Sequence, residues 1–129
     1  METTSDEEKG LIQEGPIDIA DVRTKWFPID TLLKSYYIIV MPNRLMVYGG
    51  CNVHYTMFKF GENADGRVEL KDVNWKSSSN GCGDEDDKIM NRIATVRYLQ
   101  PVYYETYRNV LFLDEEGNTL FEGSTIVTK

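Results

Sequence analysis

The chain has 129 residues, of which 41% are hydrophobic, and 21 acidic against 14 basic side chains give a formal net charge of −7. This length supports one hydrophobic core and therefore predicts a single domain. The negative charge repels a phosphate backbone, so nucleic acid is not expected as a partner. The longest apolar run, Tyr36 to Met41, is far shorter than the roughly 18 residues of a membrane span, so we expect no membrane-spanning segment.

The first nine residues are acidic and polar, whereas a secretory signal starts with basic residues followed by an apolar stretch. We therefore expect a cytoplasmic protein without a signal peptide. Apart from Leu11 and Ile12, residues 1–14 lack large apolar side chains, and such a segment buries too little surface to offset its ordering entropy. The expected organisation is a flexible acidic tail over 1–14 and one domain over 15–129.

Aromatic and β-branched residues predict several strands in the first half of the chain. Residues 16–28 fit either a strand or a short helix that stops at Pro28. Turn-forming glycines separate the later runs and place a turn over 61–66. The expected strands cover 32–41, 44–48, 53–60 and 67–75, the last of them with a bulge.

One helix is expected, from Asp84 to Arg97. Asp84 is suited to the N-cap, and the acidic residues that follow it favour the positive end of a helix. Ile89, Ile93 and Val96 follow helical spacing and are expected to face a sheet. The acidic cluster lacks the alternating ligands and the glycine of an EF-hand loop, so it indicates dipole capping rather than a calcium site.

Three strands are expected after the helix, over 102–108, 110–114 and 119–127, with Pro101 ending the connection that leads to them. The last two strands are joined by a turn over 115–118. Strands, a helix and further strands in this order predict an α+β fold, in which one helix covers or plugs a curved antiparallel sheet.

Two cysteines stand at marked positions of the chain. A turn between two strands is expected at Gly49, Gly50, Cys51 and Asn52, and Cys82 precedes the expected helix. A redox couple is one interpretation, but their separation of roughly thirty residues is unlike the Cys-x-x-Cys arrangement. Acidic residues beside Cys82 also disfavour a thiolate. A structural pair, either as thiols or as a disulfide, is the favoured interpretation.

His54 is the sole histidine, so any catalytic cysteine–histidine pair must use it. In a regular strand Cys51 and His54 point to opposite faces, and only a bulge at the glycine pair would change this. Two cysteines and one histidine supply three ligands, whereas a structural zinc site needs four. We therefore expect no catalytic centre, no metal and no cofactor.

The glycine–cysteine–asparagine turn, the second cysteine before a helix and the closing hairpin over 111–120 occur here in one order. Together they resemble the META domain family, the HslJ-like heat-shock proteins, over about 45–121. Gly50, Cys51 and Asn52 match the motif of that family, and Phe58 stands where it usually has an aromatic residue. Cys82 occupies its second cysteine position.

This resemblance implies a half-barrel-like β sheet with one helix. It also implies a link to stress response or to virulence, the latter through META-type proteins of kinetoplastid parasites, and no enzymatic reaction is established for the family. We expect a non-enzymatic binding or scaffold module for a protein partner or an apolar ligand. The alternative is a thiol-dependent redox protein that uses Cys51 and Cys82.

Aromatic side chains provide the candidate ligand or partner surface, since tyrosine combines a large rigid contact area with a polar tip. Packing in the core competes with this role and is favoured for most of the tyrosines. The open mouth of a half-barrel would also bind small apolar molecules. The candidate surface residues are His54, Phe58, Tyr103, Tyr104 and Tyr107.

Overall fold

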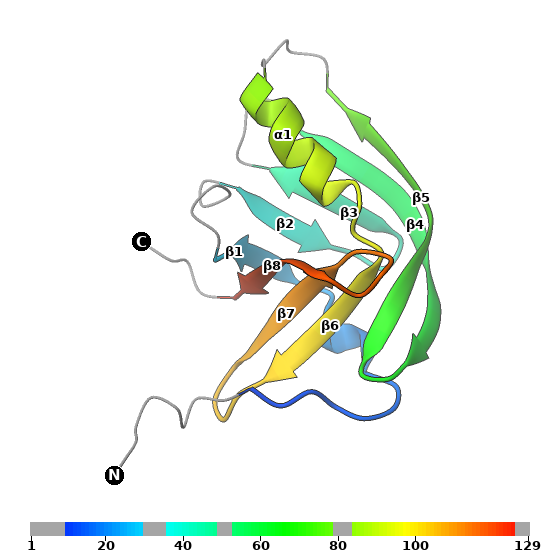
Figure 1. Ribbon diagram of the computed structural model, residues 1–129, viewed down its shortest axis with the longest axis vertical. Coiled ribbons are helices and arrows are strands. Elements are labelled where there is room, and N and C mark those ends of the chain that lie inside the picture. The colour runs from blue at the N-terminus through cyan, green and yellow to red at the C-terminus, as the bar shows by residue number, and fades with distance from the viewer. Residues whose placement is uncertain (1–9, 30–35, 49–52, 79–83, 126–129) are drawn as a thin grey trace.

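The computed structural model describes residues 10–29, 36–48, 53–78 and 84–125, with the backbone alone for 84–87 and 89. Eight antiparallel strands form one closed barrel in which each strand lies beside its neighbours in the chain (Figure 1). The strands are β1 (Lys25–Pro28), β2 (Tyr37–Val40), β3 (Arg44–Tyr48), β4 (His54–Ala64), β5 (Arg67–Ser77), β6 (Tyr98–Tyr103), β7 (Arg108–Leu113) and β8 (Thr119–Ser124). The helices are the 3-10 helix η2 (Ile19–Asp21) and the α-helix α1 (Asp84–Ile93).

Pairing between β1 and β8 closes the sheet. Phe27 pairs with Ser124 and Pro28 with Gly123, so the first strand meets the last. The expected half-barrel is therefore wrong, although the antiparallel, β-rich character is confirmed. The closure depends on β1, a strand of only four residues. It lies in the segment whose sequence fits a strand or a helix equally well, and this segment forms both η2 and β1.

The interior of the barrel is filled by side chains from every strand. Inward and outward residues alternate, as the burial patterns of β2 and β3 show. The two ends are covered by different segments (Figure 1): Ile93 and Val96 join the core at the end of α1, and Ile17 and Val22 join it beside η2. The largest fully buried side chains include Trp26, Phe112, Ile38, Leu45, Ile93, Leu99 and Leu113.

The hairpin of β4 and β5 is longer than the sequence predicts. Asp65 and Gly66 have φ values of 59° and 79°, the left-handed values that a two-residue hairpin turn requires. Because this turn needs only two residues, β4 continues to Ala64, and the expected turn over 61–66 is wrong. The expected bulge is confirmed, because Asp72 and Val73 of β5 together oppose the single Phe58 of β4.

The α-helix ends at Ile93, four residues before the expected position. Side-chain hydrogen bonds from the following residues occupy one carbonyl group of its last turn and the first carbonyl group beyond its end. The Thr95 hydroxyl donates to the Arg92 carbonyl, and the Arg97 guanidinium donates to the Ala94 carbonyl, both over 2.8 Å. The side chains of the predicted N-cap and of Ile89 lie outside the described residues.

Strand β6 spans Pro101 instead of beginning after it, so the strand expected over 102–108 is wrong. The Tyr103 N–H donates to the Leu11 carbonyl, which shows that Tyr103 and Pro101 direct their backbone nitrogens away from β7. On that edge β5 pairs with β6 only up to Leu99, so a proline there removes no ladder hydrogen bond. Leu11, which the sequence places in the tail, thus forms an isolated bridge with Tyr103.

Candidate functional site

The glycine–cysteine turn and its partner cysteine were the sequence features most suggestive of chemistry. Gly49, Gly50, Cys51, Asn52 and Cys82 all lie outside the described residues. A structural pair and a redox couple therefore both stay predictions.

The five candidate surface residues lie in separate places. His54 and Phe58 point into the barrel and are only 2% and 3% exposed, so neither belongs to an outer surface. Tyr103 lies near η2 and is partly buried. Tyr104 and Tyr107 stack at 4.6 Å between ring centroids in the β6–β7 turn. The structure thus does not bring these five side chains together into one site.

A polar pair lies on the inner face of β4 and β5. His54 pairs with Ser77 across the two strands, and its Nδ1 shares a hydrogen bond of 2.5 Å with the Ser77 hydroxyl. A histidine against a hydroxyl is the first requirement of an activated nucleophile. A hydrolase also needs free N–H groups for the developing oxyanion. Here the Val53 N–H donates to the Ser78 hydroxyl, and the Ser78 N–H donates to the Val53 carbonyl. These two N–H groups beside the pair are therefore already bonded and do not offer donors to an oxyanion.

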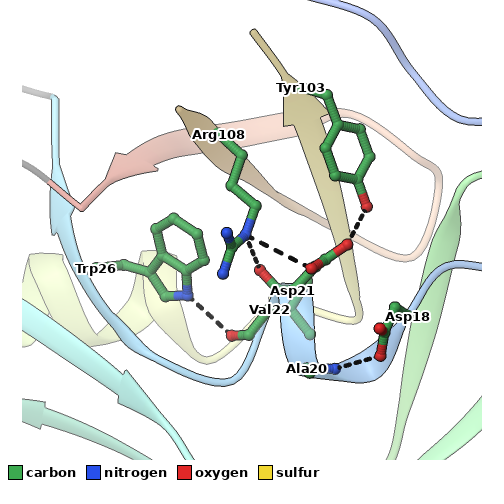
Figure 2. Close-up of polar contacts among 7 residues, drawn as sticks. All are labelled: Asp18, Ala20, Asp21, Val22, Trp26, Tyr103 and Arg108. Carbon is green, nitrogen blue, oxygen red and sulfur yellow. Dashed lines mark hydrogen bonds and ion pairs between the residues drawn. The ribbon is translucent and has the colours of Figure 1, made fainter. Parts of the chain in front are cut away.

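A second polar cluster holds η2 against the end of the barrel (Figure 2). The Tyr103 hydroxyl donates to the Asp21 carboxylate over 2.6 Å, and the Arg108 Nε donates to the Asp21 carbonyl over 2.7 Å. The Trp26 indole donates to the Val22 carbonyl over 2.9 Å. Burial raises the pKa of Tyr103, and its hydrogen bond to Asp21 raises it further. The Tyr103 hydroxyl, the Arg108 Nε and the Trp26 indole all donate within the protein, so the cluster indicates a structural role.

Several hollows lined by described residues open to solvent. One of about 430 Å³ lies where β5 and β6 separate, and its lining mixes three carboxylates (Glu69, Asp72, Glu115) with two cations (Lys71, Arg97). A second, of about 290 Å³, adjoins it at Arg97 and Glu115. The third, of about 220 Å³, lies at the β5 bulge between Met57, Lys59 and Asp72. The first two hollows are open and mostly charged, and the third is open and more apolar, so none of the three encloses a small apolar ligand.

Outward side chains of β1–β5 form a continuous row across five strands of the barrel wall. Lys25 pairs with Ile39, Ile39 with Met46, Met46 with Tyr55, and Tyr55 with Lys76. We call these residues the five-residue row. Both lysines are exposed, and the three residues between them are partly exposed. A sheet that meets water on one face normally carries polar side chains there, but β2 has none on either face.

The neighbouring outward positions extend this apolar area. On one side Tyr37 and Tyr48 stack at 5.2 Å between ring centroids, and the Lys25 ammonium lies 4.8 Å from the centroid of the Tyr37 ring. On the other side Arg44 pairs with Met57, whose side chain is 44% exposed. The only described elements in extensive contact with β2 and β3 are their neighbours in the barrel. This outer face is thus a largely apolar part of the curved barrel wall with lysines at its ends.

The described residues contain no group of three or more histidine, cysteine, aspartate or glutamate side chains arranged to hold a metal ion. No helix among them is both long and apolar enough to cross a membrane.

Comparisons with protein-family models, with curated proteins and with solved structures found no match for this chain. The resemblance to the META domain family therefore stays a prediction from the sequence.

The five-residue row was not predicted from the sequence, although one signal for it is present there. The segments 37–40 and 45–48 contain no charged residue, so both faces of each strand are apolar or aromatic. Such strands are typical of sheets covered on both faces. In this barrel one of the two faces lies on the outside.

Proposed function

We propose that this protein is a non-enzymatic binding module that docks a protein partner on the outer face of β1–β4. The observation that carries the proposal is the five-residue row, in which Ile39, Met46 and Tyr55 lie side by side and partly exposed. Contiguous apolar area on a protein surface marks interaction sites, and tyrosine and methionine are enriched in protein interfaces.

The packing of the interior supports a protein partner over a small apolar ligand. An eight-stranded barrel is just wide enough either to be filled by side chains or to hold one small molecule. Trp26, Phe112 and Leu99 are each at most 1% exposed and occupy the centre together with residues from the remaining strands. The binding surface in this proposal is therefore the outside of the barrel, and the interior is a structural core.

The sequence resemblance to META domain proteins agrees with a role without catalysis. We extend the proposal accordingly to a module that functions in stress response or virulence through its partner. The thiol-dependent alternative depends on Cys51 and Cys82, which lie outside the described residues, and it stays a prediction.

The test is site-specific photo-crosslinking of the full chain in its own cells. A photo-reactive phenylalanine analogue replaces Tyr55 in the row, and in a matched variant it replaces Tyr98, an outward residue of β6 that stacks with Arg67. We expect a discrete crosslinked protein from position 55 only, which is identified by mass spectrometry and then binds the purified chain. Equal products at both positions, or none at position 55, would contradict the proposal.

A further inference from the structure

We propose that the partner contacts this face through an acidic segment in which apolar side chains lie between carboxylates. This inference rests on the proposed function and names the chemistry of the partner. The five-residue row supplies the complementary pattern, because Lys25 and Lys76 stand at its two ends and three apolar residues lie between them. With adjacent strands about 4.8 Å apart, the path between the two lysine backbones along the curved barrel wall is roughly 19 Å.

The charge of this face is opposite to that of the whole chain. The row and its two neighbouring rows comprise ten residues, with Lys25, Lys76 and Arg44 as cations and no acidic residue among them, although the chain carries −7. The other members are Tyr37, Ile39, Met46, Tyr48, Tyr55, Met57 and Asn74. A local positive field on an acidic protein steers a negatively charged partner segment to this face.

The three cations are not neutralised within the described part of the chain, where none of them forms an ion pair with a carboxylate. The Lys25 ammonium instead lies over the Tyr37 and Phe27 rings, at 4.8 and 5.9 Å from their centroids. This contact holds the charge at one end of the row without neutralising it. With respect to the described residues, both ends of the row are therefore open to a carboxylate from a partner.

Self-association through this face is disfavoured by the same pattern. A two-fold symmetric contact places each surface against its own copy, so with the rows antiparallel Lys25 would oppose Lys76 of the second molecule. Like charges placed opposite each other across an interface cost binding energy. An anionic bilayer is disfavoured too, because it is negative over its whole surface and repels a chain of charge −7. An acidic segment concentrates its charge at the lysines alone.

The test is a nuclear magnetic resonance titration of the full ¹⁵N-labelled chain with three amphipathic 18-residue peptides. All three share a leucine face, and their polar faces carry glutamate, glutamine or lysine. We expect the Leu/Glu peptide to shift the amides of Ile39, Met46 and Tyr55 and to bind about fivefold more tightly than the Leu/Gln peptide at low salt, with the difference lost at high salt. The Leu/Lys peptide should bind most weakly.

The double variant K25E/K76E should reverse this order and prefer the Leu/Lys peptide. K88E is the control, because Lys88 is an exposed lysine on α1 that is not part of the row, and it should keep the order of the parent chain. Both variants change exposed residues, and their folding is checked from the same spectra.

Four results would overturn the inference. These are equal affinity for the Leu/Glu and Leu/Gln peptides, unchanged preference in K25E/K76E, tighter binding to phosphatidylserine vesicles than to any peptide, and dimerisation through the row. In each case a crosslinked partner at position 55 would still support the proposed function. Absence of any peptide-induced shift at the row would count against both proposals.

Discussion

The indole nitrogen of Trp26 donates a hydrogen bond to the Val22 carbonyl over 2.9 Å and so joins β1 to the turn that follows η2. Trp26 is 0% exposed and pairs with Ile38 of β2, which places it at the start of the closed barrel. The same strand is the one that pairs with β8. This contact therefore connects the covering of one barrel end to the closure of the sheet.

Trp26→Phe should lower the free energy of unfolding by about 2 kcal/mol, because it leaves the Val22 carbonyl without its donor and reduces packing in the core. The measurement is urea-induced unfolding. Trp75→Phe is a matched control, since the Trp75 indole nitrogen is buried without a hydrogen-bond partner in the described structure. It should cost less than about 1 kcal/mol. Equal losses in the two variants would show that the indole hydrogen bond contributes nothing.

Gly123→Ala should destabilise the barrel by about 1–3 kcal/mol, because an added methyl group overfills the place where β1 meets β8. A Cβ at Gly123 would lie 3.0 Å from Trp26 Cβ and 3.2 Å from Phe112 Cε1. The control is Gly61→Ala. The atoms nearest its added Cβ belong to the long side chains of Lys71 and Glu69, which can move aside, so this change should alter stability little. Unfolding of both variants in urea compares them. An unchanged free energy of unfolding in Gly123→Ala would argue against tight packing where β1 meets β8.

Tyr103→Phe should make stability less sensitive to alkaline pH. The pKa of Tyr103 is raised in the folded protein by burial and by its hydrogen bond to Asp21. A raised pKa means that the stabilisation is fully present below the ordinary tyrosine pKa of about 10 and is lost as the pH rises above it. Unfolding free energies between pH 8 and 11 should therefore fall more steeply in the parent chain than in the variant. Parallel curves would contradict this assignment.

Asp114→Ala should make the stability of the β7–β8 hairpin less dependent on pH in the acid range. The backbone N–H groups of Asn118 and Glu116 each donate to the Asp114 carboxylate over 2.9 Å, and these bonds, that of Asn118 foremost, lower its pKa. Because the pKa of Asp114 is lower in the folded state, its carboxylate stabilises the fold at pH values above the unfolded-state pKa of about 3.9. This contribution is lost as the pH falls through the pKa of the folded state. A carbon-detected titration should give Asp114 a midpoint below 3.9. A midpoint at or above 3.9 would refute the assignment.

The sequence predicted those elements best whose signals are local. Strand β3 begins and ends as expected, and the hairpin of β7 and β8 is confirmed because Gly117 provides the left-handed turn at φ 86°. The bulge in β5 was also predicted. These features depend on residues a few positions apart, for which alternation and turn chemistry are direct signals.

Closure of the barrel depends on contacts that are distant in the sequence. The pairs Phe27–Ser124 and Pro28–Gly123 join residues that are about three quarters of the chain apart in sequence, and no local pattern specifies them. The sequence predicts a strand boundary at Pro101, because the residues around it do not show which edge of β6 lacks a partner. The burial of His54 and Phe58 likewise follows from the register between β3, β4 and β5. The row on the outer face emerges only once that register is known.

The most direct test of the proposed function is the affinity of the crosslinked partner, once purified, for the double variant I39S/M46S. Both side chains point outward and are partly exposed, so folding should be preserved, whereas loss of two central apolar contacts should weaken binding roughly 30-fold. Leu111→Ser is the control, because Leu111 is a partly exposed apolar residue of β7, and it should leave the affinity unchanged. Unchanged affinity in I39S/M46S, or an equal loss in Leu111→Ser, would contradict docking on the outer face of β1–β4.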